Sequence, residues 1–166
     1  MPGLPFGAAQ QHAIPRELLT YENIASIEYI EANPSLPYPR SAAYRPIEGG
    51  AQMRVRDRTA EIEDIELSVP EARAYIEALV NSGLFSWNRV YRPAQGTFVN
   101  EALQWRIEVT FSQGGTPKKR RPFRVEGEEE TPSDYEQVVA LLMNGFSAGI
   151  VADSDADSNA EVDADE

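Results

Sequence analysis

A run of four basic residues forms the one basic cluster of the sequence. The run consists of Lys118, Lys119, Arg120 and Arg121. Such a cluster could contact the phosphates of RNA, with Trp105 or Tyr91 stacking on the bases. Charged residues also protect an edge strand against pairing with other sheets. We favour protection of an edge, because Trp105 falls on the apolar face of a predicted hairpin. Weak nucleic-acid binding through residues 118–121 stays open as an alternative.

The carboxylates form no set that is typical of a metal site or an acid–base pair. Asp153, Asp155 and Asp157 alternate like the first ligands of a calcium loop. However, Ser158 stands at the position of the required glycine, and Ala164 at that of the bidentate glutamate. Acid–base catalysis needs two carboxyl groups held close in different environments. The candidates are Glu61, Glu63, Asp64, Glu66 and Glu108, and their spacing distinguishes none of them. We therefore predict no catalytic residue and no metal ligand.

Cysteine and histidine chemistry is almost absent from the chain. There is no cysteine, which excludes disulfides, thiolate metal sites and a cysteine nucleophile. The single histidine, His12, lies in a segment rich in proline, glycine and glutamine, which suits neither a Ser-His-Asp triad nor a metal site. The glycine pairs at 49–50 and 114–115 lack the Lys-Ser/Thr sequence of a nucleotide loop. We predict no cofactor, and these residue types favour a non-catalytic protein over an enzyme.

Charge is distributed unevenly along the chain. The formal net charge is −12, and the last 16 residues contain seven acids and no base. This sign argues against general binding to nucleic acid or to an anionic membrane, because phosphate repels it. No apolar run is long enough to span a membrane, and residues 1–13 lack the pattern of a secretory signal. We expect a cytoplasmic protein.

The elements that would position any site are organised around residues 103–125. Five large apolar side chains alternate with polar ones, which predicts a strand with one buried face. They are Leu103, Trp105, Ile107, Val109 and Phe111. Residues 113–116 then provide glycines for a hairpin turn, and Phe123 and Val125 continue the apolar face in a returning strand. The polar face of this hairpin carries Arg106, Glu108 and Thr110.

The rest of the chain predicts three more strands and two helices. The strands are expected near residues 24–31, 51–58 and 87–91. A capping box formed by Ser68 and Glu71 starts a helix over residues 68–81, which Gly83 ends, and a second helix runs from Thr131 to about residue 146. Pro34, Pro37, Pro39 and Pro46 mark residues 33–46 as an extended connecting loop. Its P-x-x-P motif could instead be a polyproline ligand, but we favour the connecting loop.

These elements predict an α+β fold, with an antiparallel sheet of about five strands and two helices packed on one face. We expect a flexible N-terminal arm over residues 1–22, the α+β domain over 23–149 and a disordered acidic tail over 150–166.

Part of the sequence resembles a group of uncharacterised small bacterial α+β domains. In that group a helix leads into a strand with a tryptophan, then into a hairpin with its own tryptophan and a helix that begins Pro-x-x-aromatic. The matching positions are Gly83 to Trp87, Tyr91, Trp105, Pro132 and Tyr135. Leu103 and Gln104 replace the Asp-Gly that many members carry before the hairpin tryptophan. The resemblance implies no activity.

We interpret the chain as a non-catalytic interaction domain, possible forms of which are an acidic inhibitor or an immunity-type protein that blocks a basic partner. The helix-free polar face of the sheet either meets water or contacts an unknown protein partner. The predicted contact residues are Arg106, Glu108, Thr110, Lys118, Lys119, Arg120 and Arg121. The alternative from another class is a small ligand-binding protein or enzyme with a pocket between the sheet and the helices.

Overall fold

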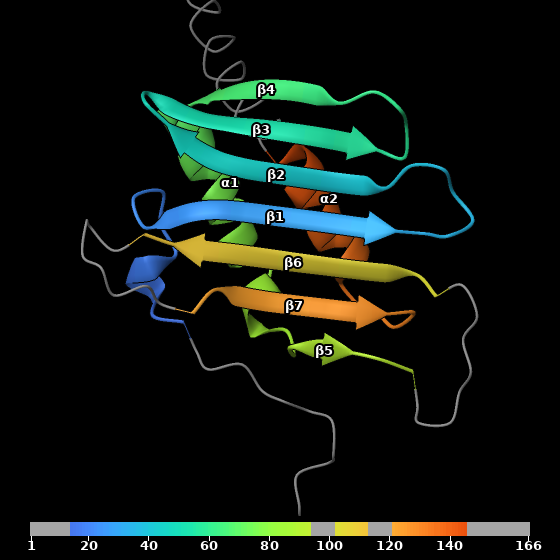
Figure 1. Ribbon diagram of the computed structural model, residues 1–166. Helices are drawn as coiled ribbons and strands as arrows, with labels where there is room; N and C mark the ends of the chain where they lie inside the picture. Colours follow the sequence, from blue (N-terminus) through green and yellow to red (C-terminus); the bar gives the residue numbers. More distant parts are fainter. Residues whose placement is uncertain (1–13, 94–101, 113–120, 146–166) are drawn as a thin grey trace, which may run out of the picture.

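One sheet forms the frame of the computed structural model, which describes residues 14–93, 102–112 and 121–145. The two α-helices of these residues lie behind the sheet in Figure 1, and the front face carries no helix. The strands are β1 (Ile24–Ala32), β2 (Arg40–Ile47), β3 (Gly50–Asp57), β4 (Glu63–Ser68), β5 (Val90–Tyr91), β6 (Gln104–Phe111) and β7 (Phe123–Glu128). The α-helices are α1 (Val69–Asn81) and α2 (Tyr135–Asn144), and short 3₁₀ turns cover Arg16–Leu18 and Leu84–Ser86. No helix in these ranges is long and apolar enough to cross a bilayer.

The strand order across the sheet is β4-β3-β2-β1-β6-β7-β5. The first four strands form a meander, and β6 and β7 form a hairpin that joins it through the pairing of β1 with β6. All neighbours are antiparallel except β5, which runs parallel to β7. The predicted α+β class and the two helices on one face are therefore confirmed.

The sheet has seven strands in the described residues, and the expectation of about five was wrong. The two extra strands are β2, which we expected to be a loop, and β4, which is rich in acids. Pro46 does not interrupt β2, because the pairing with β1 runs only from Arg40 to Tyr44 and Pro46 faces β3 alone. A strand tolerates proline where no ladder hydrogen bond is needed. The acids of β4 are tolerated because β4 is an edge strand.

The core lies between the sheet and the helices. Trp105, Ile107, Val109 and Phe111 of β6 are buried, as their alternation predicts. The helices add apolar stripes, which include Tyr75 and Leu79 of α1 and Val138, Val139 and Leu142 of α2. Ile14, Leu18, Leu19 and Tyr21 pack against the same core from the segment before β1. The space between the layers is therefore filled by side chains.

The helix starts differ in how they are capped. Ser68 and Glu71 form the predicted capping box of α1, and Gly83 follows the helix with a φ of 90°. In contrast, α2 begins at Tyr135, later than expected, and Asp134 at its N-cap forms no capping bond. The Asp134 carboxylate instead accepts a hydrogen bond from Nε1 of Trp87 at 3.0 Å. The side chain that could cap α2 is thus used to fix a core tryptophan.

The proline motif of residues 34–37 lies in a tight turn. The Leu36 amide donates to the Asn33 carbonyl at 2.9 Å, and the Ser35 amide donates to Oδ1 of Asn33 at 3.0 Å. A turn closed by such bonds is not a polyproline helix, which has no internal hydrogen bonds. The segment therefore connects β1 to β2, in agreement with the interpretation that we favoured.

Two stacked tyrosines in the core differ in one hydrogen bond, which gives a matched test. The rings of Tyr44 and Tyr75 lie 5.4 Å apart. The Tyr75 hydroxyl donates to the Leu142 carbonyl at 2.9 Å, whereas the buried Tyr44 hydroxyl has no partner among the described residues. We expect Tyr75→Phe to lower the free energy of unfolding by about 1 to 2 kcal/mol and Tyr44→Phe to lower it by less than about 0.5 kcal/mol or to raise it. Urea unfolding followed by circular dichroism measures both, and equal losses would contradict the assignment of the bond.

Candidate interaction surface

The helix-free side of the sheet, which we call the open face, carries the polar residues predicted on β6. Arg106, Glu108 and Thr110 alternate with buried neighbours and so point away from the helices. Two of the three already have partners on the same face. Thr110 forms a hydrogen bond with the Ser26 hydroxyl, and Glu108 forms an ion pair with Nη1 of Arg124 at 3.9 Å.

Arg106 is the third of these β6 residues, and its side chain stays available. Its side chain is exposed, and its guanidinium has no hydrogen-bond or ion-pair partner in the part of the chain that the structure describes. Ile30 lies opposite Arg106 on β1, with 42% of its surface exposed. An exposed isoleucine beside an unpaired arginine is a suitable centre for a protein contact.

The basic cluster is described only in part. Arg121 is exposed, two residues before β7, whereas Lys118, Lys119 and Arg120 lie outside the described residues. Trp105 is not accessible for stacking. It is 2% exposed, and its Nε1 donates to the Glu130 carbonyl at 2.9 Å. Stacking of a base on Trp105 would therefore require the core to open.

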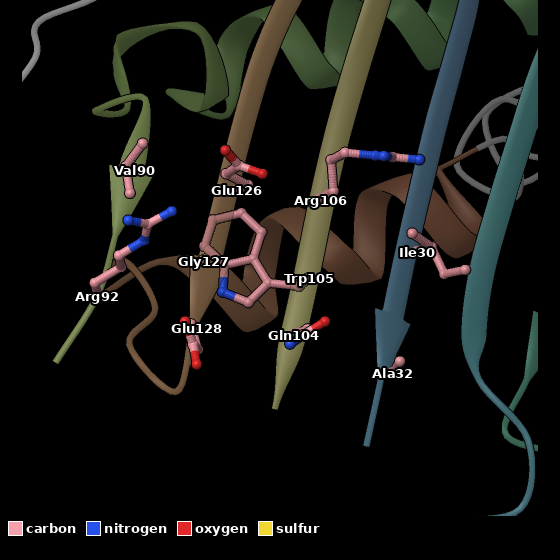
Figure 2. A pocket seen from close by; sticks show the side chains of 10 residues that line it. All are labelled: Ile30, Ala32, Val90, Arg92, Gln104, Trp105, Arg106, Glu126, Gly127 and Glu128. Carbon is pink, nitrogen blue, oxygen red and sulfur yellow. The ribbon is translucent and has the colours of Figure 1, made fainter. Parts of the chain in front are cut away.

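A trough of about 400 Å³ crosses the open face over β1, β6, β7 and β5. Figure 2 shows Arg106 extending from β6 towards β1, and Arg92 pointing from the end of β5 towards Gly127. Glu126 and Glu128 of β7 complete the charged lining, and Ile30 and Ala32 provide an apolar part. The trough thus presents two guanidinium groups, two carboxylates and a small apolar floor.

Gly127 lines the trough, and its lack of a side chain leaves room for the Trp105 indole. It pairs with Trp105 across β6 and β7, and a Cβ on Gly127 would lie 2.2 Å from Nε1 of Trp105. The indole therefore occupies the space where a side chain of residue 127 would lie on the helix side. Trp87 and Tyr135 hold that indole in place, with ring centroids 5.9 Å and 5.0 Å from Trp105.

Adding a methyl group at Gly127 is expected to destabilise the fold. Because the indole is buried and packed against Trp87 and Tyr135, Gly127→Ala should lower the free energy of unfolding by about 1 to 3 kcal/mol. The loss should shrink in a Trp105→Val background, where the methyl group finds room. Urea unfolding of the two single variants and the double variant measures this coupling. Additive losses would show that the two residues do not compete for one space.

A smaller hollow of about 220 Å³ adjoins the trough at Ile30 and Arg106. Its floor contains Ser41 and Ala43 of β2, whose short side chains leave space between Arg54 and Arg106. Nε of Arg54 donates to Oδ1 of Asp64 at 2.9 Å. The two hollows make the middle of the open face concave, with Ile30 and Arg106 shared between them.

Sequence analysis missed a buried charged cluster on the opposite face. Glu31, at the end of β1, is only 3% exposed. Its Oε2 accepts from the hydroxyls of Tyr135 at 2.5 Å and Tyr29 at 3.0 Å and from Nη2 of Arg40 at 2.6 Å. Its Oε1 accepts from Nη2 of Arg58 at 2.8 Å. The signal was present in the sequence, because the alternation Ile27, Tyr29, Glu31 places the carboxylate on the buried face.

The electrostatics of this cluster keep Glu31 charged. Burial opposes the ionised carboxylate, but the hydrogen bonds from Tyr135, Arg58 and Arg40 outweigh it and lower the pKa of Glu31 to about 2. Burial also raises the pKa of Tyr29 and Tyr135, so both hydroxyls keep the protons that they donate. A carboxylate of this kind is a poor proton acceptor near neutral pH. The cluster instead ties the first turn of α2 to β1 and β2, since Arg40 also bonds Glu136 at 3.3 Å.

The chain matches no family model, no curated protein and no solved structure. The resemblance to small bacterial domains therefore stays a prediction. Within the ranges that the structure describes, no group of acids and histidine is arranged to hold a metal ion. A third hollow, of about 330 Å³, lies between residues 16–22 and α1, away from the open face.

Proposed function

We propose that this chain is a non-catalytic interaction domain that contacts a protein partner through the open face, centred on Ile30 and Arg106. The observation that supports it most is the concave middle of that face, where an exposed isoleucine lies beside an arginine with no partner among the described side chains. Arginine is one of the residue types that supply most of the binding energy in many interfaces, and such residues cluster near the centre of the contact.

The composition of the open face suits a partner that binds and leaves. Charges of both signs lie near Ile30, because Arg92, Arg106, Glu126 and Glu128 line the same trough. Interfaces of proteins that also exist apart are about as polar as the rest of the surface, whereas permanent interfaces are more apolar. A mixed, partly apolar face therefore fits a reversible complex.

The charge of the whole chain favours a basic partner. With a net charge of −12, the domain attracts a positively charged protein over several ångströms and accelerates its association. An acidic inhibitor or immunity-type protein that blocks a basic enzyme such as a nuclease is the specific form of the proposal. Removal of residues 150–166 should then slow association with the partner and reduce its salt dependence, and unchanged rates would remove the electrostatic form.

Site-specific photo-crosslinking tests the surface before the partner is known. A photoreactive residue replaces Ile30 in one variant and Glu77, which is exposed on α1, in a matched control. After irradiation in the native cell, we expect one defined protein adduct from position 30 and none from position 77. An adduct from position 77 alone, or no adduct from position 30, would contradict the proposal.

A further inference from the structure

The outer edge of β4 has no paired strand among the described residues. β4 ends the sheet on one side, and no other described segment forms backbone hydrogen bonds with its outer edge. The opposite end of the sheet is β5, which has only two residues. An exposed edge of six residues presents alternate N–H and C=O groups to an incoming strand.

The side chains on the two faces of β4 indicate which sequence pattern a strand paired with this edge would need. Asp64 and Glu66 lie on the open face, opposite Arg54 and Gln52 of β3. Ile65 and Leu67 lie on the helix side, where Leu67 is buried and Ile65 is half-buried. Because side chains alternate between faces, a neighbouring strand with the same period would place basic residues beside the acids and apolar residues beside Ile65.

The same charges make a second copy of the chain a poor occupant. Pairing β4 with β4 would bring Asp64 and Glu66 close to the acids of the other copy, and like charges opposite each other destabilise a sheet. Asp64 is partly neutralised by Arg54 at 2.9 Å, whereas exposed Glu63 and Glu66 have no side-chain partner in the described ranges. The acids of β4 therefore disfavour pairing with the β4 strand of a second copy and favour pairing with a basic strand.

We propose that β4 binds an extended segment of a basic protein partner, in which arginine or lysine alternates with apolar residues, as an added strand of the sheet. Main-chain hydrogen bonds would supply affinity, and the alternating side chains would supply specificity. This surface is distinct from the open-face centre at Ile30, so each proposal can fail without the other.

Binding of a short peptide and of two N-methylated forms of it to the full 166-residue chain tests the added strand. The probe is acetyl-Arg-Val-Arg-Val-Arg-Val-amide, which carries the predicted alternation. In a strand, all arginine N–H groups point to one edge and all valine N–H groups to the other. N-methylation of one set should therefore weaken binding by about tenfold or more, while methylation of the other set leaves it unchanged. Fluorescence anisotropy of the labelled peptides measures the three affinities.

Charge-reversed variants locate the contact. Glu66→Arg should weaken binding of the unmodified peptide about threefold to tenfold, because one favourable cross-strand pair becomes unfavourable. Glu77→Arg on α1 changes the net charge equally and should leave the affinity unchanged. Absence of binding, equal loss in both variants, or equal binding of both methylated peptides would overturn the proposal. A dimer of the chain alone that Glu66→Arg dissociates would assign the edge to a second copy and overturn it too.

Discussion

Replacement of Glu31 by alanine should lower the free energy of unfolding by about 3 to 5 kcal/mol, the usual cost of breaking a buried ion pair. The variant leaves Arg40, whose side chain is 11% exposed, without its closest carboxylate. It also removes the acceptor that the Tyr29 and Tyr135 hydroxyls share, and because these hydroxyls lie 2.9 Å apart, only one of them can donate to the other instead. Urea unfolding followed by tryptophan fluorescence measures the loss.

Glu136 provides a control within the same cluster. It also bonds Arg40, but its side chain is 73% exposed. We expect Glu136→Ala to cost less than about 1 kcal/mol, because water solvates an exposed ion pair and replaces most of its benefit. Equal losses for Glu31→Ala and Glu136→Ala would show that the buried carboxylate does not stabilise the junction of β1 and α2.

The second large effect is a loss of stability at low pH, caused by protonation of Glu31. The pKa of Glu31 is about 2 in the folded chain, against an ordinary value of 4.5. Between these values the unfolded state binds the proton and the folded state does not, so stability falls as the pH falls. The contribution of the charged carboxylate is complete above about pH 5 and should decrease by about 3 kcal/mol towards pH 2.

Comparison of the stability of wild type and Glu31→Gln at each pH separates the titration of Glu31 from that of the other acids. The variant has no proton to bind at this position, so the stability difference between wild type and variant should be constant above pH 5 and should narrow below it. Glu136→Gln, which removes the exposed carboxylate that also bonds Arg40, is the matched control. A difference for Glu31→Gln that is independent of pH would contradict the lowered pKa.

Local patterns predicted the elements that bury one face. The alternation around Trp105 and Ile107 identified the β6–β7 hairpin, and the Ser68–Glu71 capping box identified the start of α1. In these stretches each residue type agrees with its position in the fold. Such agreement makes a short window of sequence sufficient.

The remaining features depend on partners that are distant in the sequence. β2 contains Pro46 and forms because β1 and β3 supply its hydrogen bonds. The carboxylate of Glu31 is stable in the core only because Arg58 and Tyr135 reach it from residues 27 and 104 positions away. The trough likewise requires Gly127 to lie beside Trp105. No local window contains these pairs.

The β1–β6 junction determines the order in which the chain can assemble. The meander β1 to β4 and the β6–β7 hairpin are each made from neighbouring segments, whereas Ile27 meets Val109 only after the intervening chain has closed into a loop. Closing so long a loop costs entropy before its contacts form, and topologies rich in such contacts fold slowly. We therefore expect the pairing of β1 with β6 to form late in folding, with the unpaired edges of β1 and β6 exposed until then.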